Sequence, residues 1–410
     1  MMIFYALGLR LYALVVRFAA FFNEKARFMV EGRKSIFSRI EDDLCSDDRH
    51  IWVHAASLGE FEQGRTVIEE IKNRYPDYKI VLTFFSPSGY EVRKNYKGAD
   101  YIYYLPLDSA KNARCFVGLI NPEKVFFIKY EFWYFYLREL KRKNIPTYIF
   151  STIFRDNQIF FKWYGGLWRK MLGVFTHLFV QNDSSIELLN SIGISNCSKA
   201  GDTRFDRVHE IATKAKVLPL ISTFAADSKV VVCGSTWPKD EDNLVRYITE
   251  NSSDYKWIIA PHETHKKHID EIVSKFNGDV LLYSEASEDT IKDAKVLVID
   301  CIGILSSVYQ YASISYIGGG FGVGIHNTLE AATFGLPIVF GPNYLRFKEA
   351  VDMKDRGAAF SYIEYSELKF ILDKLISDES FMKERGVIAS SYVSENVGAT
   401  KLIVDKSFIA

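Results

Sequence analysis

The stretch "IWVHAASLGEFEQGRTVIEEIKNR", residues 51–74, contains one complete strand-to-helix unit. Its first part, 51–57, is a short run of β-branched, aromatic and small residues, and its last part, 60–74, has apolar residues at helical spacing. Small residues join the two parts and place Glu60 at the start of the expected helix. A glutamate in a first helical turn is ordinarily explained by capping or by the helix dipole. Whether Glu60 has a further role depends on what the rest of the chain places around it.

The same strand–helix alternation continues in two series along the chain. The first series includes "KIVLTFF", "YIYYLPL", "KVFFIKY", "PTYIFST" and "HLFVQN", and the second includes "KVVVCGS", "KWIIAPH", "DVLLYSE", "KVLVID", "SISYIGGG" and "PIVFGP". Helical patterns separate most of these runs, for example at 131–143, 302–312 and 327–335. This alternation predicts parallel, doubly wound α/β sheets. Two Rossmann-like domains facing a cleft is the GT-B organisation, but such domains also occur in other enzymes, so architecture alone does not give function.

The alternation stops over residues 203–228, which are mixed in composition and contain no strand-like run. We therefore expect four parts. They are a membrane anchor with a basic juxtamembrane segment at 1–40, an N-terminal Rossmann-like acceptor domain at 41–205, a linker at 206–228, and a C-terminal Rossmann-like nucleotide-binding domain at 229–410.

The overall composition excludes several classes of protein. A chain of 410 residues is long enough for two domains with proper cores. Lys+Arg and Asp+Glu both number 51, and this zero net charge argues against a general nucleic-acid binder. The five cysteines are scattered and form no CxxC pair, which predicts reduced thiols in a cytosolic compartment.

Basic and apolar residues are concentrated at the N-terminus. The segment "IFYALGLRLYALVVRFAAFF", 3–22, has the length of a membrane span, but it contains Arg10 and Arg17 on one helical face. A helix with one basic stripe and apolar faces favours interfacial anchoring in a membrane. A single span and a buried helix with snorkelling arginines remain as alternatives. No clean cleavage site follows, so a secretory signal peptide is not expected.

The segment "YIGGGFGVGIHNTLEAATFGLPIVFGP", 316–342, is the most informative about ligands. A strand leads into Gly318, Gly319 and Gly320, and a helix is expected to open near Asn327. Glycines let a backbone approach a ligand closely, and the free N–H groups at a helix start favour a phosphate. Glu330, one turn later, could accept hydrogen bonds from ribose hydroxyls. The spacing differs from GxGxxG, so a dinucleotide site is less favoured, and a purely structural turn remains an alternative.

Four segments together resemble the 3-deoxy-D-manno-octulosonic acid (Kdo) transferases, membrane-associated GT-B enzymes that move Kdo from CMP-Kdo to the lipid A precursor, lipid IVA. The segments are "HAASLGE" (54–60), "GDTRFD" (201–206), "DCIGIL" (300–305) and "GGGFGVGIHNTLEAA" (318–332). Each segment alone is a weak signal, whereas the combination is specific and spans nearly the whole chain. The resemblance implies an inverting transfer in lipopolysaccharide core biosynthesis, on the cytoplasmic face of a Gram-negative inner membrane.

The resemblance also implies roles for individual residues. It assigns Glu60 as the general base that takes a proton from the acceptor hydroxyl. Glu131, in "IKYEFW", is expected as a second cleft carboxylate that assists the acceptor or the base, with plain capping as the alternative. The implied donor-binding residues are Pro261, His262, Gly303, Ile304, Leu305, Asn327, Thr328, Leu329 and Glu330, and the further cleft candidates are Ser57, Arg204, Ser235, Gly319 and Gly320.

The chain departs from the family pattern at three places. Many members carry Pro-Arg-His where this chain has Pro261 and His262, so the arginine is missing here and His262 or a nearby lysine would have to replace its contact. Lys129 and Tyr130 stand where many members have a Thr-Glu-Leu-Trp-Pro-like run, and "DCIGIL" lacks an acidic residue that many members place after the glycine.

No metal or other cofactor is expected, because a helix start and a few hydrogen-bond donors can stabilise the single phosphate of a leaving CMP. "HETHKKH" invites a metal-site interpretation through His262, His265 and His268, but steps of three residues fan over about 120° on a helix. A solvated basic helix is expected there instead. The expected partners are CMP-Kdo, lipid IVA and inner-membrane lipids, with no nucleic acid. Two alternatives are another GT-B transferase that uses a UDP-sugar and a lipid acceptor, and a non-catalytic membrane-bound nucleotide sensor.

Overall fold

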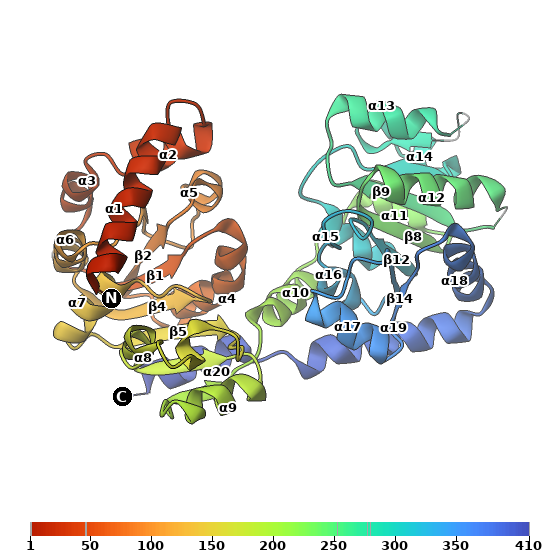
Figure 1. Cartoon of the computed structure of the whole chain (residues 1–410). Helices are drawn as coiled ribbons and strands as arrows, with labels where there is room; N and C mark the ends of the chain where they lie inside the picture. Colours follow the sequence, from red (N-terminus) through yellow and green to blue (C-terminus); the bar gives the residue numbers. More distant parts are fainter. Residues whose placement is uncertain (1, 46, 252, 277, 279, 410) are drawn as a thin grey trace. The chain divides into compact units, whose positions relative to one another are not determined.

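The computed structural model describes residues 2–45, 47–251, 253–276, 278 and 280–409, and it divides the chain into two compact units. Unit 1 comprises residues 1–207 and 397–410, and unit 2 comprises residues 208–396. Each unit has its own parallel sheet, and Figure 1 shows helices packed around both sheets. The α/β class and the two Rossmann-like units expected from the sequence are confirmed.

The sheet of unit 1 has seven strands in the order β3-β2-β1-β4-β5-β6-β7. Their bounds are β1 Arg49–Ala55, β2 Tyr78–Phe84, β3 Tyr101–Tyr104, β4 Pro122–Ile128, β5 Thr147–Thr152, β6 His177–Val180 and β7 Cys197–Lys199. All pairs are parallel, and β1 pairs with both β2 and β4 at the centre of the sheet. The order reverses between β1 and β4, so the segments after these two strands leave side by side from the carboxyl edge, where α/β sheets bind ligands.

Helices cover both faces of this sheet because its strands are apolar on both sides. The helices of unit 1 are α1 Met2–Ala19, α2 Glu24–Glu31, α3 Ile36–Asp43, α4 Leu58–Arg74, α5 Pro87–Arg93, α6 Ala110–Ile120, α7 Tyr134–Arg142, α8 Gly166–Leu172, α9 Asp183–Ser191, α10 Thr203–Thr213 at the unit boundary and α20 Ala399–Phe408, with a 3₁₀ turn η1 at Ile159–Phe161. One core joins the sheet to α3, α6 and α7, for example through Trp52, Phe116 and Tyr136. The opposite core joins it to α4 and α20 through Phe61 and Ile403.

Unit 2 has a second seven-stranded parallel sheet in the order β10-β11-β9-β8-β12-β13-β14. Its strands are β8 Val230–Thr236, β9 Lys256–Pro261, β10 Val280–Leu282, β11 Val296–Val298, β12 Ile314–Ile317, β13 Ile338–Phe340 and β14 Ala359–Ser361. Its helices are α11 Pro219–Ala225, α12 Pro238–Glu250, α13 Lys266–Ser274, α14 Thr290–Asp293, α15 Leu305–Val308, α16 Leu329–Ala332, α17 Lys348–Asp355, α18 Tyr365–Ser377 and α19 Glu379–Glu395, with 3₁₀ turns η2 Tyr283–Glu285 and η3 Tyr309–Tyr311. The central strand β8 lies between β9 and β12.

The structure divides the chain differently from the expected ranges. The expected linker at 206–228 is mostly helical, since it contains most of α10 and all of α11. The C-terminal residues do not stay with unit 2, because α20 packs on α4 of unit 1. Hydrogen bonds to Asp206 hold the returning C-terminal segment on unit 1. Its carboxylate accepts the backbone N–H groups of Gly398 (2.7 Å) and Thr400 (2.9 Å) at the start of α20.

Three expected helices are shorter than their sequence patterns. The 131–143 pattern becomes α7, which begins at Tyr134, so Glu131 lies in the loop before the helix and does not open it. The 302–312 pattern becomes the short α15 followed by η3. The helix expected to open near Asn327 is only α16, four residues that begin at Leu329. Glycines and tight turns therefore occupy more of these segments than helical spacing indicated.

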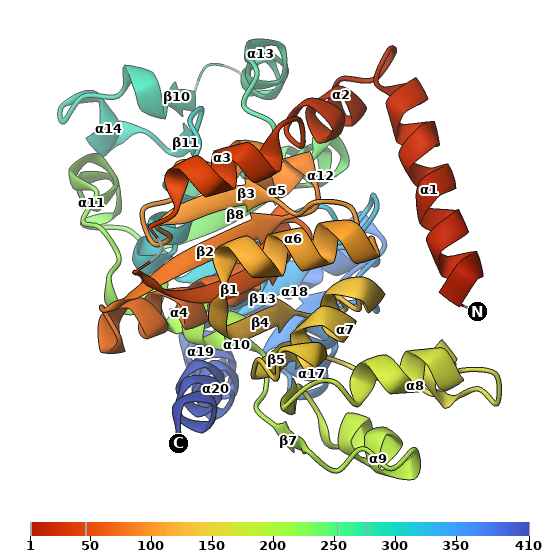
Figure 2. The ribbon, with the colours of Figure 1, turned by 90° about the vertical axis from the view of Figure 1, so that its left-hand side faces the viewer.

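The N-terminal residues form two helices, α1 and α2, with a bend of 120° between them (Figure 2). Among the described residues no single helix is long and apolar enough for a membrane span, whereas this bent pair meets the criterion together by length and composition alone. One side of α1 packs on unit 1, where the Tyr5 hydroxyl donates a 2.7 Å hydrogen bond to Asp108. The other side exposes large apolar side chains, among them Phe4 (75% exposed), Leu11 (62%) and Phe18 (68%).

Candidate functional site

Glu60 lies in the first turn of α4, directly after the central strand β1. Ser57 is the N-cap residue of α4, and the Glu60 carboxylate reaches back to accept the backbone N–H of Ala56 at 2.6 Å. The pKa of Glu60 is raised to about 7, mainly by burial and also by the negative charge of Glu131. The Ala56 N–H, Lys129 and the Ser57 N–H act in the opposite direction. Glu60 therefore combines a capping geometry with a carboxylate that can exchange a proton near neutral pH.

Glu131 is held in place by a chain of buried hydrogen bonds that starts inside the sheet. The Trp52 indole N–H donates to Thr83 Oγ1 (2.8 Å), and Thr83 Oγ1 lies 2.8 Å from His54 Nδ1. His54 Nε2 lies 3.1 Å from Glu131 Oε2, and Trp133 Nε1 donates to that same oxygen at 2.7 Å. His54 Nδ1 also lies 3.1 Å from the Thr83 carbonyl oxygen, and a proton on Nε2 lets the ring donate to Glu131. The side chain of Glu131 is thereby fixed beside Glu60.

The backbone is strained at the carboxyl ends of β4, β5 and β8. Lys129, Ser151 and Ser235 have φ of 63°, 57° and 55°, in the left-handed region that favours glycine. Such conformations cost of order 1–3 kcal/mol each and persist only where the surroundings enforce them. They occur at the carboxyl ends of strands, where Lys129 precedes Glu131 in unit 1 and Ser235 lies beside the glycine run of unit 2.

The "GDTRFD" motif has structural contacts that its sequence did not reveal. The Thr203 hydroxyl lies 3.0 Å from that of Ser151 and also donates to the Gln63 carbonyl of α4. Arg204 donates from its Nε and its backbone N–H to the Asp202 carboxylate, both at 2.9 Å. The motif therefore anchors the start of α10 to unit 1, and the structure gives Arg204 a carboxylate partner within its own turn.

Close backbone packing within unit 2 requires glycine at positions of the run Gly318–Gly320. A Cβ on Gly318 would lie 2.2 Å from the Ser235 carbonyl oxygen, and one on Gly320 would lie 2.6 Å from the Gly341 Cα. Gly319 has φ 91°, and its N–H donates a 2.8 Å hydrogen bond to Asp240 at the start of α12. Because Gly318 and Gly320 have no Cβ, the carboxyl ends of β8, β12 and β13 can lie close together. The segment after β12 packs on this edge of the sheet.

A stack of three rings lies at this edge. The Trp237 and His262 rings are 4.9 Å apart, and the His262 and His326 rings are 4.3 Å apart, both in stacked geometry. Trp237 Nε1 donates to His326 Nε2 at 2.9 Å, so His326 carries its own proton on Nδ1. Burial, together with His262, lowers the pKa of His326 to about 4, so this ring is neutral at physiological pH. The stack offers a flat ring surface and one N–H donor to a ligand.

The residues from Asn327 to Glu330 follow directly after this stack. Asn327 Oδ1 accepts the backbone N–H of Leu329 (3.1 Å), and Asn327 Nδ2 donates to Glu330 Oε1 (2.9 Å). Leu329 is fully buried, whereas the Thr328 hydroxyl is buried without a hydrogen-bond partner among the described residues. Because α16 has only four residues, the phosphate-binding argument from a helix dipole is weaker here than the sequence predicted.

The remaining donor-site candidates surround the same edge of the sheet. Pro261 ends β9, and the backbone N–H of His262 donates to the Thr236 carbonyl of β8 at 2.9 Å. Gly303 has φ 95° in the turn after β11, followed by Ile304, the N-cap residue of α15, and by Leu305. The Leu305 side chain lies against Gly234 of β8. The unit 2 candidates are thus gathered at the carboxyl ends of β8, β9, β11 and β12.

The histidine-rich segment is partly buried and differs from the expected solvated helix. His265 is the N-cap residue of α13, and His268 is buried, with Nε2 2.9 Å from Glu241 and Nδ1 3.0 Å from the Glu263 carbonyl. Glu263, His265 and His268 bring potential metal-ligating atoms within 4.8 Å of one another. Both ring nitrogens of His268 are occupied by protein partners, so this set fits a structural role better than a metal site.

Sequence reasoning missed four side chains in these two clusters, namely His54, Trp237, Asp240 and His326. His54 and His326 lie inside the segments 54–60 and 318–332, Trp237 directly follows β8, and Asp240 lies in the first turn of α12. His54 was visible as a histidine within the run "IWVHAAS", 51–57, and a polar residue buried in a central strand requires a partner. No signal in one sequence indicates the stack of Trp237 with two histidines.

Comparison with known proteins gives consistent results for both sequence and fold. Residues 24–207 match the family model described as 3-deoxy-D-manno-octulosonic-acid transferase. A 3-deoxy-D-manno-octulosonic acid transferase of Rickettsia felis is 27% identical over 301 residues, which cover 72% of this chain and 64% of that protein. The transferase of Aquifex aeolicus is 26% identical over 342 residues, covering 81% of this chain and 88% of its own.

The fold comparison extends across both units. The crystal structure of UDP-GlcNAc 2-epimerase from Neisseria meningitidis bound to UDP-GlcNAc aligns with a TM-score of 0.61 and 16% identity, covering 87% of this chain and 98% of that one. At this identity the match shows the shared fold, which is GT-B, and nothing about the ligand. The family model over residues 24–207 and the relatives agree, and this chain is similar in sequence to the 3-deoxy-D-manno-octulosonic acid (Kdo) transferases.

Proposed function

We propose that this protein transfers Kdo from CMP-Kdo to lipid IVA in lipopolysaccharide core biosynthesis, with inversion at the anomeric carbon and with Glu60 as the general base. The observation that carries the proposal is the Glu60 carboxylate. It follows the central strand of the unit that matches the family model, and its pKa is raised to about 7. A carboxylate with this pKa is ionised in a large fraction of molecules at neutral pH and is a stronger base than an ordinary glutamate.

In the proposed reaction the Glu60 carboxylate accepts the proton of an acceptor hydroxyl. The hydroxyl oxygen then forms a bond to the anomeric carbon of Kdo, and the bond from that carbon to the CMP phosphate oxygen breaks. CMP leaves with the bonding electron pair as its phosphate regains a charge. Glu131 is proposed as a positioning residue for Glu60, because it is fixed by His54 and Trp133 and its charge keeps the Glu60 pKa high.

The donor is proposed to bind at the carboxyl edge of the unit 2 sheet. Glu330, oriented by Asn327, supplies a carboxylate for ribose hydroxyls, and the turn at Gly303 supplies backbone groups for the base. His262 has no arginine neighbour in the sequence, and it stacks on Trp237 and His326. The Nδ1–H of the neutral His326 is the candidate replacement donor for the phosphate or the Kdo carboxylate. No step requires a metal ion, and we propose a metal-independent reaction.

We further propose that α1 holds the protein at the cytoplasmic face of the inner membrane. Its exposed side carries Phe4, Leu11 and Phe18 on a helix that also contains Arg10 and Arg17, the composition of an interfacial helix near anionic headgroups.

A CMP-release assay tests the proposed reaction. CMP-Kdo is incubated with the full-length protein, with and without lipid IVA in detergent, and released CMP is quantified. Acceptor-dependent release supports transfer. Release at the same rate without acceptor would indicate a hydrolase, and the absence of release from a protein that binds CMP would indicate a nucleotide sensor. Calorimetry with CMP and UDP distinguishes the proposed donor from a UDP-sugar.

A further inference from the structure

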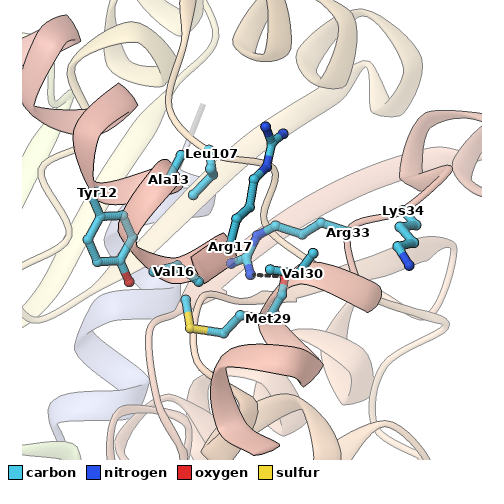
Figure 3. A pocket seen from close by; sticks show the side chains of 9 residues that line it. All are labelled: Tyr12, Ala13, Val16, Arg17, Met29, Val30, Arg33, Lys34 and Leu107. Atoms are coloured by element: carbon cyan, nitrogen blue, oxygen red, sulfur yellow. Dashed lines mark hydrogen bonds between the residues drawn. The ribbon is translucent and has the colours of Figure 1, made fainter. Parts of the chain in front are cut away.

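A cavity of about 330 Å³ lies between α1, α2 and the segment after β3 (Figure 3). Its walls are partly apolar, including Ala13 and Val16 of α1, Val30 of α2 and Leu107. Its charged residues are Arg17, Arg33 and Lys34, and no acidic residue lines it. A cavity with three cations, no carboxylate and apolar walls is suited to a ligand that is both anionic and apolar.

Arg33 forms the fixed part of this cavity. Its guanidinium donates to the carbonyl oxygens of Leu105 (2.8 Å), Met29 (2.9 Å) and Phe85 (2.7 Å). It also lies over the rings of Phe85 and Tyr104, at 4.9 Å and 5.0 Å from their centroids. Burial lowers the pKa of Arg33 to about 10, so the group remains protonated at neutral pH. Its partners among the described residues are carbonyls and rings, so its positive charge is not neutralised by a carboxylate.

Arg17 and Lys34 form the adaptable part of the cavity. Figure 3 shows the Arg33 guanidinium turned toward Met29, while the Arg17 and Lys34 side chains extend away from it. Neither Arg17 nor Lys34 forms an ion pair within the described part of the chain, and both side chains are exposed. Like charges placed around one cavity repel one another, and an anion bound among them removes that repulsion.

A second cavity, of about 510 Å³, continues along α1 and shares Ala13 and Leu107 with the first. It adds Arg10 and Lys111, and it includes the first turn of α6. Its one carboxylate, Asp108, is turned to the Tyr5 hydroxyl and to the backbone N–H groups of α7. The two cavities therefore form a cationic groove beside the helix whose opposite side exposes apolar residues.

We propose that the first cavity binds the phosphate of an anionic glycerophospholipid of the bilayer, with Arg17 and Lys34 as its recognition residues and the apolar wall of α1 and α2 beside its glycerol and upper acyl chains. The proposal rests on the proposed membrane contact of α1, because that contact brings headgroups to the cavity. Binding of one such lipid would hold α1 against α2 and so link the composition of the membrane to the orientation of unit 1. Neither Glu60 nor any donor-site candidate is among the residues that line this cavity.

The test uses two double variants that remove the same charge. Arg17→Gln/Lys34→Gln removes two cations that line the cavity, whereas Lys25→Gln/Arg27→Gln removes two exposed cations of α2 that do not. Arg33 is left in place, because its loss would release three backbone carbonyls. Full-length protein in a neutral detergent is titrated with phosphatidylglycerol, phosphatidylcholine or soluble glycerol phosphate, and native mass spectrometry counts the bound molecules. Lys34→Glu is a second cavity variant at an exposed side chain, in case the first double variant does not fold.

Wild-type protein and the Lys25/Arg27 variant should each retain one phosphatidylglycerol in preference to phosphatidylcholine. The Arg17/Lys34 variant should bind it about tenfold or more weakly. Equal losses in the two double variants would overturn the site and leave only general electrostatic attraction. Tight binding of glycerol phosphate alone would also overturn the lipid assignment in favour of a soluble anion. Because bound lipid is counted without any Kdo transfer, failure of this site and failure of the proposed reaction are distinguishable.

Discussion

The imidazole of His54 and the carboxylate of Glu131 lie 3.1 Å apart, although His54 belongs to β1, Glu131 lies in the loop after β4, and the two residues are 77 positions apart in the sequence. The contact is buried on both sides, and Trp133 donates to the same carboxylate oxygen. It explains why Glu131 stays beside Glu60 when the electrostatic repulsion between two carboxylates would favour their separation. The arrangement assigns different roles to the two glutamates, and each role can be tested.

Replacement of Glu60 by glutamine should lower turnover by about 10²- to 10⁴-fold, because the amide cannot accept a proton in the transfer step. CMP affinity should be unchanged, since the donor-site candidates lie in unit 2. Steady-state kinetics and CMP calorimetry on one preparation measure both quantities. Glu62→Gln, two positions along α4, is the matched control, and its surface pair with Arg93 contributes little to stability. Turnover within a few-fold of wild type in Glu60→Gln would reject Glu60 as the base.

Replacement of Glu131 by glutamine should shift the pH dependence of kcat/KM. The ascending limb for wild type is expected near pH 7, where Glu60 loses its proton. Glu131 raises the Glu60 pKa through its negative charge, so a neutral side chain at this position should move the limb to lower pH. Glu139→Gln, on α7 of the same unit, should leave it in place. A limb that stays near pH 7 in Glu131→Gln would show that Glu131 does not act on Glu60.

Replacement of Glu330 by alanine should raise the CMP dissociation constant by about tenfold or more, because a hydrogen bond to a charged group contributes roughly 1.5–3 kcal/mol. Asn327 orients this carboxylate, so Asn327→Ala should weaken CMP binding in the same direction. Glu288→Ala removes an exposed glutamate of unit 2 and serves as the control. Calorimetry that gives wild-type affinity for folded Glu330→Ala would remove this residue from the donor site.

Substitutions on the exposed side of α1 should release the protein from membranes without disturbing its packing on unit 1. Phe4→Ser/Leu11→Ser/Phe18→Ser removes three side chains whose insertion contributes about 2 kcal/mol each, so binding to vesicles should fall by at least 100-fold. The control is Ile363→Ser/Phe370→Ser/Val387→Ser, which changes three equally exposed apolar residues of unit 2. Vesicle sedimentation measures both variants. Equal retention of the α1 variant and wild type would contradict the anchoring role.

Chelation should leave the transfer rate unchanged if the reaction is metal-independent. The assay compares turnover before and after dialysis against EDTA. A loss of activity that added metal restores would contradict this proposal. Glu263, His265 and His268 would then be the first residues to substitute.

The strand–helix alternation was sufficient to predict both sheets, because buried parallel strands read as apolar runs in any sequence. It could not predict that α20 returns to unit 1, since the bond from Asp206 to the start of that helix joins residues 192 and 194 positions apart. The family resemblance indicated Glu60 but not His54, because the partner of a buried histidine depends on which strands become neighbours. The order β2-β1-β4 is what places Thr83, His54 and Glu131 together.

The glycine run shows the same limit in unit 2. Its sequence indicated a close backbone approach, and the structure has one, but Gly318 and Gly320 approach other strands of the protein rather than an open site. Helical spacing after Asn327 predicted a longer helix than α16, because the turns that end it depend on contacts with residues outside the segment.

Mass spectrometry of the lipid product tests the central claim most directly. Lipid IVA is incubated with CMP-Kdo and either wild-type protein or the Glu60→Gln variant. The lipid is then extracted and its molecular mass is measured. The account predicts that wild type converts lipid IVA to a product heavier by one or more whole Kdo residues, while folded, CMP-binding Glu60→Gln leaves it almost unchanged. Unmodified lipid IVA after incubation with wild-type protein that binds CMP, or equal conversion by the two proteins, would contradict it.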